Sequence, residues 1–134
     1  MTATDGEMTA FFAQFSSGSA RLDPELLGAR FAEVFLVGDA SGAKPVSREA
    51  FLRMLPQRAE TFTRAGIGTP VLDQLTFDNL DDHYTLARTE WTAPRDGGDT
   101  VRLVSSYLLH RQDGALRVVA YLNHRGPNTP VTTP

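Results

Sequence analysis

Residues 82–125 of this chain have the sequence DHYTLARTEWTAPRDGGDTVRLVSSYLLHRQDGALRVVAYLNHR, and this stretch decides the fold. Apolar and polar residues alternate along it, a pattern typical of β-strands that bury one face. Asp113-Gly114 stands between the last two alternating segments, and Asp-Gly in that position is the strongest short-range signal for a two-residue β-hairpin. The stretch therefore predicts a C-terminal antiparallel meander with strands near residues 83–92, 101–111 and 116–125.

The register of the predicted hairpin follows by counting outward from its two-residue turn, and it places Ser106 opposite Tyr121. One face of the two strands is then mostly apolar, and we expect it in the core. The other face mixes hydroxyl, imidazole, amide and aromatic groups, as a ligand pocket or a polar dimer interface does. The candidate ligand-binding residues on this mixed face are Ser106, His110, Tyr121 and Asn123, with Trp91 added from the preceding strand.

The first part of the chain has helical periodicity. Met8–Phe15 carries four large apolar side chains on one helical face, and the polar run Ser16–Ser19 is expected to end that helix. Asp23-Pro24 supplies an N-cap and a proline at the first helical position, so it predicts a second helix that continues to Val34. The continuous apolar run Val34–Val37 predicts a short buried strand.

A third helix is predicted after a short return strand at Lys44-Pro45-Val46. Ser47 is its expected N-cap, and Gly66 marks its end. Pro56 is expected to kink or divide the helix, because proline removes one backbone hydrogen bond and crowds the preceding turn. From residue 69 onward the apolar period shortens to two, which predicts the first strand of the sheet.

Composition limits the possible classes of protein. With 134 residues, 41% of them hydrophobic, we expect a single domain at residues 1–125 and a mobile tail at residues 126–134. A net charge of −3 with scattered basic residues argues against nucleic acid as a partner. The absence of cysteine excludes disulfides and thiolate metal ligands. Without a signal-peptide pattern or an apolar stretch of the ~20 residues that span a bilayer, we expect a cytoplasmic protein with no membrane partner.

Residues 31–55, FAEVFLVGDASGAKPVSREAFLRML, resemble the part of nuclear-transport-factor-2-like proteins in which a helix leads into a short hairpin and a third helix. The segments LDDHYTLARTEW and LRVVAYLNHR look like long strands of that superfamily, particularly of its SnoaL-like branch. The resemblance covers about residues 8–125. It implies a cystatin-like α+β domain whose N-terminal helices pack in a strongly curved, cone-shaped antiparallel sheet. Such domains often have a pocket at the open end of the cone and a sheet face that forms a dimer.

Three residues are candidate catalytic groups. His83 follows an acidic residue and is a candidate general base, although a histidine after an acidic turn is more often simply exposed. The resemblance implies a carboxylate near the pocket mouth at Asp39, and turn chemistry explains Gly-Asp equally well. His110 lies on the predicted mixed face. The three histidines have no metal-ligand spacing, so we expect neither a metal nor a cofactor.

Three classes of function remain open, because a fold does not determine an activity. The leading hypothesis is a homodimeric protein that binds a small apolar or amphipathic molecule in a largely apolar pocket at the open end of the cone. The second is a SnoaL-like cyclase, isomerase or hydratase that uses Asp39 or a histidine as base. The third is a dimerisation or scaffold module without a ligand.

Overall fold

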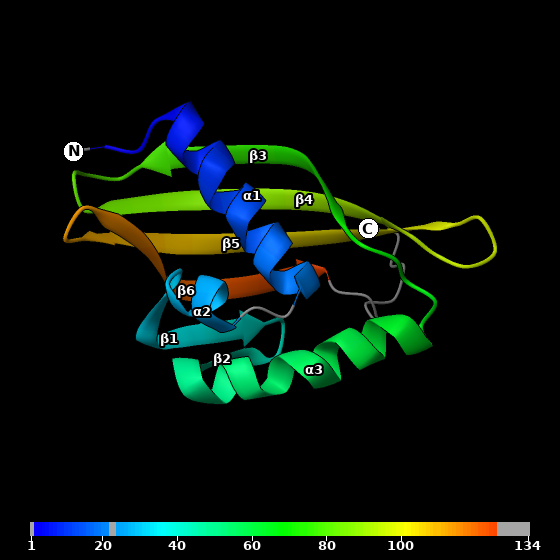
Figure 1. The fold of residues 1–134 in the computed structure, drawn as a ribbon. Coiled ribbons are helices and arrows are strands. Elements are labelled where there is room, and N and C mark those ends of the chain that lie inside the picture. Colours follow the sequence, from blue (N-terminus) through cyan, green and yellow to red (C-terminus); the bar gives the residue numbers. More distant parts are fainter. Residues whose placement is uncertain (1, 22–23, 126–134) are drawn as a thin grey trace.

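The computed structural model describes residues 2–21 and 24–125, so the predicted tail and the predicted N-cap Asp23 lie outside the described residues. The described chain contains three helices and six strands (Figure 1). These elements are α1 (Asp5–Arg21), α2 (Pro24–Gly28), β1 (Phe31–Asp39), β2 (Gly42–Ser47), α3 (Arg48–Arg64), β3 (Val71–Asn79), β4 (Tyr84–Pro94), β5 (Thr100–Gln112) and β6 (Ala115–Arg125). The strands form one sheet in the order β2-β1-β6-β5-β4-β3.

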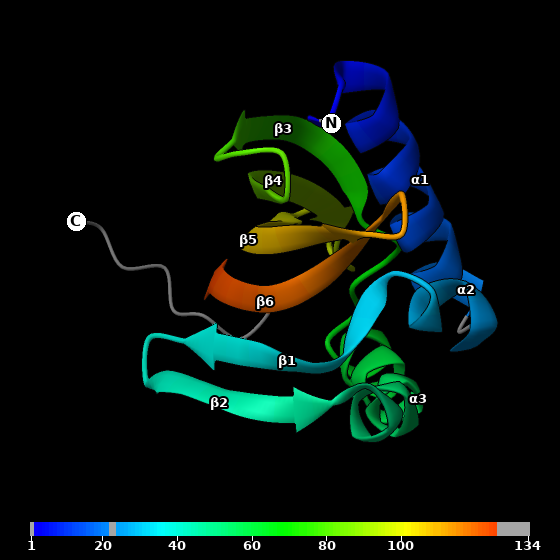
Figure 2. The ribbon, with the colours of Figure 1, turned by 90° about the vertical axis from the view of Figure 1, so that its left-hand side faces the viewer.

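The sheet is curved, and α1 packs across one of its faces (Figure 2). This arrangement confirms the predicted α+β fold. Neighbouring strands are antiparallel except β1 and β6, which run parallel, with Phe31 opposite Val118 and Val37 opposite Tyr121. The prediction of a wholly antiparallel sheet is therefore wrong for this pair. Because β1 forms its hairpin with β2, its other edge is left for β6, the last strand of the described residues.

Helix α1 covers the sheet with its apolar face, where Met8, Phe11 and Phe12 are buried. It continues through Ser16–Ser19 to Arg21, so the predicted end of this helix is wrong. The glycine in this run, Gly18, costs a helix about 1 kcal/mol relative to alanine. Burying one large apolar side chain contributes about 1.5–3 kcal/mol, which outweighs that cost.

Strand β1 begins three residues after α2 ends, so the predicted continuation of the second helix to Val34 is wrong. Phe31 and Phe35 are buried on the helix-facing side, whereas Val34 and Leu36 are 59% and 45% exposed on the other side. The apolar run predicted to be wholly buried therefore alternates between the two faces. Pairing with a strand on each edge fixes the extended backbone, and alternation follows from it.

Helix α3 begins and ends where the sequence predicts. The backbone N–H of Ala50 donates to the Ser47 hydroxyl over 3.1 Å, which confirms the N-cap. Gly66, at φ +71°, follows the last turn in the left-handed conformation that glycine adopts without strain. Pro56 lies inside the helix without dividing it. Helix α3 packs against β1 and β2 (Figure 1). Its second half also reaches β6, because Arg58 donates to the Tyr121 hydroxyl.

Candidate functional site

The turn at Asp113-Gly114 has the predicted form. Both residues have positive φ, +52° and +80°, as a type I′ hairpin turn requires. Near the turn the predicted register is also correct, since His110 lies opposite Arg117.

Farther from the turn the register shifts, because β6 contains a β-bulge opposite the junction of Leu108 and Leu109. Tyr121 therefore pairs with Tyr107, and the predicted pairing of Tyr121 with Ser106 is wrong. Asn123 likewise pairs with Ser105. A bulge adds one residue to one strand, so every side chain beyond it changes face relative to simple counting.

The bulge divides the predicted ligand-binding residues between the two faces of the sheet. Trp91 and Tyr121 are buried on the helix-facing side, and Asn123 is half-buried on the same side. Ser106 and His110 lie on the outer face. The predicted mixed face therefore does not exist as one surface, and its members form two separate groups.

The three candidate catalytic residues do not meet at one site. Asp39 is exposed at the tip of the β1–β2 hairpin, where the backbone N–H and the hydroxyl of Ser41 donate to its carboxylate over 2.8 and 2.5 Å. These hydrogen bonds, mainly the one from the Ser41 hydroxyl, lower the pKa of Asp39, so its carboxylate is a weak base. His83 is exposed in the turn before β4, and His110 lies on the outer face.

The helix-facing side instead gathers two tyrosines and an arginine. Tyr107 and Tyr121 are 2% and 5% exposed, and their rings stack at a centroid distance of 5.1 Å and an angle of 20°. Arg58 of α3 donates from Nη2 to the Tyr121 hydroxyl over 3.2 Å. Its guanidinium also lies 5.9 Å from the Tyr121 ring centroid and 5.8 Å from that of Phe62. Arg58 as a whole residue is exposed, but burial acts against the charge of its guanidinium, so the contact joins a partly desolvated cation to a buried phenol.

A chain of hydroxyl groups continues from the tyrosines across β5 and β4. The side chains of Ser105 and Thr89 lie beside Tyr107 and act to lower its pKa, and Ser105 acts in the same direction on the pKa of Tyr121. The indole N–H of Trp91 donates to the Thr89 hydroxyl over 2.8 Å. All five residues are at most 7% exposed. We call these five residues and Arg58 the tyrosine cluster.

The two phenols of the tyrosine cluster differ in acidity. Burial, reinforced by the neighbouring Tyr121, raises the pKa of Tyr107 above its ordinary value. Burial also acts to raise the pKa of Tyr121, but the charge of Arg58 and hydrogen bonds with Arg58 and Ser105 outweigh it and lower that pKa. The negative charge that Tyr121 can carry raises the pKa of Arg58 in turn.

Sequence reasoning did not find Arg58, and it left Tyr107 open between a pocket and the core. A signal for Arg58 exists, because Phe51, Leu55 and Phe62 mark the sheet-facing stripe of α3, and Arg58 stands in that stripe at helical spacing. A charged residue at a core-facing position indicates a buried partner or a ligand. Counting from the turn predicts Tyr107 opposite Ala120, and only the bulge brings it opposite Tyr121.

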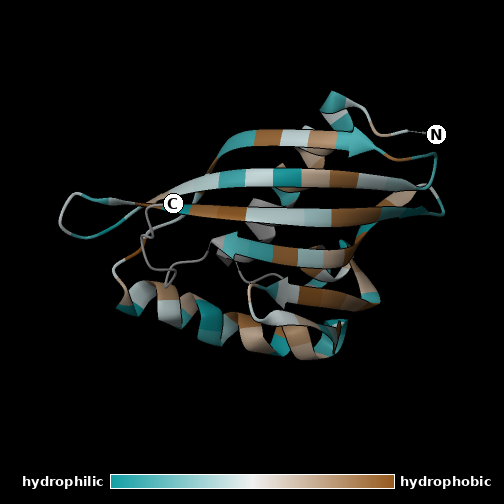
Figure 3. Cartoon of the chain, turned by 180° about the vertical axis from the view of Figure 1, so that it is seen from behind, coloured by the Kyte–Doolittle hydropathy of each residue, from teal (hydrophilic) through white to brown (hydrophobic). Residues whose placement is uncertain are grey.

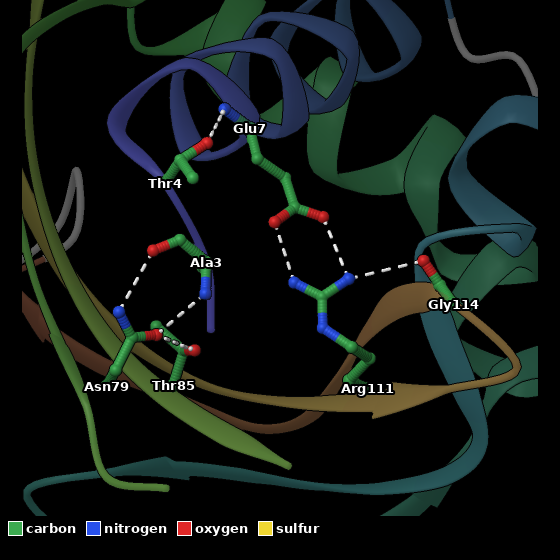
Figure 4. Close-up of polar contacts among 7 residues, drawn as sticks. All are labelled: Ala3, Thr4, Glu7, Asn79, Thr85, Arg111 and Gly114. Carbon is green, nitrogen blue, oxygen red and sulfur yellow. Dashed lines mark hydrogen bonds and ion pairs between the residues drawn. The ribbon is translucent and has the colours of Figure 1, made fainter. Parts of the chain in front are cut away.

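A second polar cluster, shown in Figure 4, fastens α1 and the segment before it to the sheet. Arg111 donates to both carboxylate oxygens of Glu7, over 2.9 and 2.6 Å. The Asn79 side chain donates to the carbonyl of Ala3 and accepts from its N–H, and Thr85 donates to the same Asn79 oxygen. All of these groups have protein partners, so the second cluster holds α1 in place over the sheet.

The outer face of the sheet is not covered by any described helix (Figure 3). A row of directly paired apolar residues crosses four strands on this face: Leu36, Ala120, Leu108 and Leu86. Leu36, Leu86 and the nearby Leu122 are 40–45% exposed. Beside them the Ser106 hydroxyl and His124 Nε2 are 2.7 Å apart.

The chemistry available at the tyrosine cluster is hydrogen bonding and charge stabilisation. Among the described residues, no histidine or carboxylate contributes to it, and nowhere in residues 2–21 and 24–125 do three potential metal ligands gather. Phenol and guanidinium groups donate well to carbonyl or carboxylate oxygens.

No helix within residues 2–21 and 24–125 is long and apolar enough to cross a membrane.

Solved structures share this fold at low sequence identity. A protein of unknown function with a cystatin-like fold from Nostoc punctiforme has a TM-score of 0.75 at 13% identity, covering 98% of this chain and all of that chain. An NTF2-like protein from Cytophaga hutchinsonii has a TM-score of 0.70 at 10% identity, covering 92% and 98%. A putative calcium/calmodulin-dependent protein kinase II association domain from Xanthomonas campestris has a TM-score of 0.64 at 16% identity, covering 95% and 91%.

A search of curated protein sequences finds no match. A family model described as NTF2-like protein (DUF6841) matches residues 6–126, which include every helix and strand except the first residue of α1. The chain belongs to this family of nuclear-transport-factor-2-like proteins.

Proposed function

We propose that the protein binds a small, partly apolar molecule on the helix-facing side of β4, β5 and β6, at the tyrosine cluster. The observation that carries the proposal is the concentration of polar groups where a plain core would have aliphatic side chains. Tyr107, Tyr121, Ser105 and Thr89 are each at most 5% exposed. A few polar groups set among aromatic and apolar walls are typical of small-molecule sites.

The polar groups of the cluster lie next to one another. The indole N–H of Trp91 donates to the Thr89 hydroxyl, the Arg58 guanidinium donates to the Tyr121 hydroxyl, and Ser105 lies beside both tyrosines. A buried polar cluster of this kind costs folding free energy relative to apolar packing unless every member is satisfied. A binding role explains why polar residues occupy this position.

Trp91 is the only tryptophan of the chain, so its fluorescence reports on this site directly. We expect titration with a neutral apolar dye such as Nile red to change Trp91 emission and to saturate. Replacing Tyr107 with alanine opens the aromatic stack and weakens this binding by about tenfold, since a stacked aromatic pair contributes about 0.5–1.5 kcal/mol beyond its buried area. Replacing the exposed Leu80 with alanine leaves binding unchanged. No saturable change with any ligand of a broad metabolite panel contradicts the proposal.

The outer sheet face favours a second copy of the chain as partner. Its apolar row is continuous across four strands, and exposed apolar patches of this kind mark interaction sites. The Xanthomonas protein of the same fold is described as an association domain, which is in keeping with this proposal. Homodimerisation through the sheet is compatible with ligand binding, because the tyrosine cluster lies on the opposite face.

The enzymatic alternative has less support. A general base must come within hydrogen-bond distance of the proton that it removes. Asp39, His83 and His110 all lie away from the tyrosine cluster. Unchanged turnover of a candidate substrate in single variants of these three residues would remove them from any mechanism.

A further inference from the structure

We propose that Arg58 is an anchor for the carboxylate of a small aromatic or unsaturated organic acid, whose planar body lies against the rings of Tyr121 and Phe62. This inference rests on the proposed binding function and names its ligand class. The Arg58 guanidinium is a cation that has no carboxylate partner among the described residues. Among the described residues, Arg58 contacts the Tyr121 hydroxyl and two aromatic rings, and no carboxylate pairs with it.

Several other arginines of the described chain have carboxylate partners, whereas Arg48 of the same helix donates to the backbone carbonyls of Gly28 and Phe31. Arg53 pairs with Glu49, Arg64 with Glu60, and Arg111 with Glu7. Arg53 and Arg64 belong to the same helix as Arg58, so α3 places acids one turn away from two of its arginines and leaves the one in its sheet-facing stripe without such a partner. The difference points to an anion supplied from outside the chain.

The geometry of the guanidinium favours a carboxylate. Arginine has five N–H donors in a planar fork that matches two carboxylate oxygens, and among the described residues Arg58 donates one hydrogen bond, to Tyr121. A phosphate carries more charge and usually draws several cations or a helix N-terminus. Arg58 lies in the second half of α3, away from the N-terminus of that helix, and it is the only cation of the tyrosine cluster.

The surroundings of Arg58 define the rest of the ligand. The guanidinium lies within 6 Å of two aromatic ring centroids, and the tyrosine ring beside it is stacked on a second one. Flat π-systems pack well against such rings in offset or edge-to-face arrangements. When a carboxylate is joined directly to an aromatic ring or a double bond, it lies in the plane of that apolar group. Such a flat acid fits the site, because its carboxylate can accept from the planar Arg58 guanidinium while its apolar part packs against the nearby aromatic rings.

The test compares acids with neutral molecules of the same shape. Benzoate and cinnamate are titrated against benzamide and cinnamamide, with Trp91 fluorescence and calorimetry as readouts, at low ionic strength. We expect at least one acid to bind about tenfold more tightly than its amide, because a charge-assisted pair adds about 1.4 kcal/mol or more. Acid binding also raises the pKa of Tyr121, followed by phenolate absorbance, since a new negative charge sits beside its hydroxyl.

Three variants assign the effect to Arg58. In Arg58→Gln, acid affinity falls about tenfold, while amide affinity stays within about twofold. Arg58→Lys keeps the charge without the fork and gives an intermediate affinity. Arg53→Gln is the matched control on α3, and it leaves both affinities unchanged. Equal far-ultraviolet circular dichroism and equal unfolding midpoints verify that the variants are folded.

The outcomes separate this inference from the proposed function. If Nile red or an amide binds and the acids bind no better, the carboxylate anchor is wrong and the binding function stands. If acids bind equally well to Arg58→Gln, the anchor is also wrong. If neither acids nor neutral molecules bind at all, both proposals fail.

Discussion

Glu7 and Arg111 illustrate how much a single ion pair depends on burial. The Arg111 side chain is 10% exposed and that of Glu7 is 34% exposed, so water screens the pair only in part. Both carboxylate oxygens accept from the guanidinium, which gives the pair a fixed geometry. Hydrogen bonding with Arg111, more than its charge, lowers the pKa of Glu7 below its ordinary value of 4.5.

We predict that Glu7→Gln lowers the free energy of unfolding at pH 7 by about 1 kcal/mol, a value between those of exposed and buried pairs. The matched control is Glu60→Gln, whose pair with Arg64 is more than half exposed on both sides. We expect this control to change stability by less than about 0.5 kcal/mol. Urea unfolding of the wild type, Glu7→Gln and Glu60→Gln measures the differences in the free energy of unfolding.

The contribution of Glu7 has a defined pH dependence. Its pKa is lower in the folded than in the unfolded protein, so the stabilisation is present above pH 4.5 and is lost as the pH falls through the folded-state pKa. The difference between the wild type and Glu7→Gln is therefore expected to shrink below pH 4.5. A difference that stays constant from pH 7 to pH 3 would mean that packing, and not charge, holds α1 at this point.

At the scale of single elements, the β5–β6 turn requires positive φ at both of its residues. We predict that Gly114→Ala, at φ +80°, lowers the free energy of unfolding by about 1 kcal/mol, because a Cβ atom is disfavoured in this conformation. Gly6→Ala is the opposite control, since Gly6 lies in α1 with open space around it. There alanine raises stability by up to about 1 kcal/mol. Equal effects at the two glycines would contradict the turn assignment.

The N-cap of α3 offers a second test at this scale. Ser47→Ala removes the acceptor of the Ala50 N–H, and we predict a loss of about 1 kcal/mol in the free energy of unfolding. Ser47→Asp restores an acceptor at the same place and is expected to recover most of the loss. Thermal unfolding of the two variants decides between a cap and a mere surface serine.

Local chemistry made most elements predictable from the sequence. The caps of α3 and the Asp113-Gly114 turn act through neighbouring residues, so their positions were predicted correctly. The faces of β6 were not predictable, because a β-bulge arises from pairing between strands and leaves no fixed sequence pattern. The prediction that the candidate ligand-binding residues share one face is wrong for the same reason: one added residue places Tyr121 and Asn123 on the helix-facing side and leaves Ser106 and His110 on the outer face.

At the scale of the whole molecule, the sheet has two faces of different character. Helices cover the face that carries the tyrosine cluster, and the outer face keeps Val34 and Leu36 exposed (Figure 3). A monomer rarely leaves a continuous apolar row in water. The proposed ligand site and the proposed partner surface therefore lie on opposite faces of the sheet.

We predict that light scattering after size-exclusion chromatography gives twice the chain mass for the wild type. Leu36→Arg places a charge in the middle of the apolar row and is expected to yield the monomer mass. Met54→Arg is the matched control, because Met54 is equally apolar and 59% exposed on α3. The control keeps the dimer. A wild type of monomer mass at every concentration would contradict dimerisation through the sheet.

The parallel pairing of β1 with β6 has a consequence for how the chain reaches its fold. The β1–β2 hairpin pairs residues that are close in the sequence, whereas the other edge of β1 pairs with β6, which is the last strand of the described residues. Contacts between distant parts of a chain slow folding, because the loop between them must be ordered first. During synthesis, the backbone groups on this edge of β1 therefore have no partner strand until β6 has left the ribosome. We expect aggregation of a nascent or truncated chain to begin at this edge.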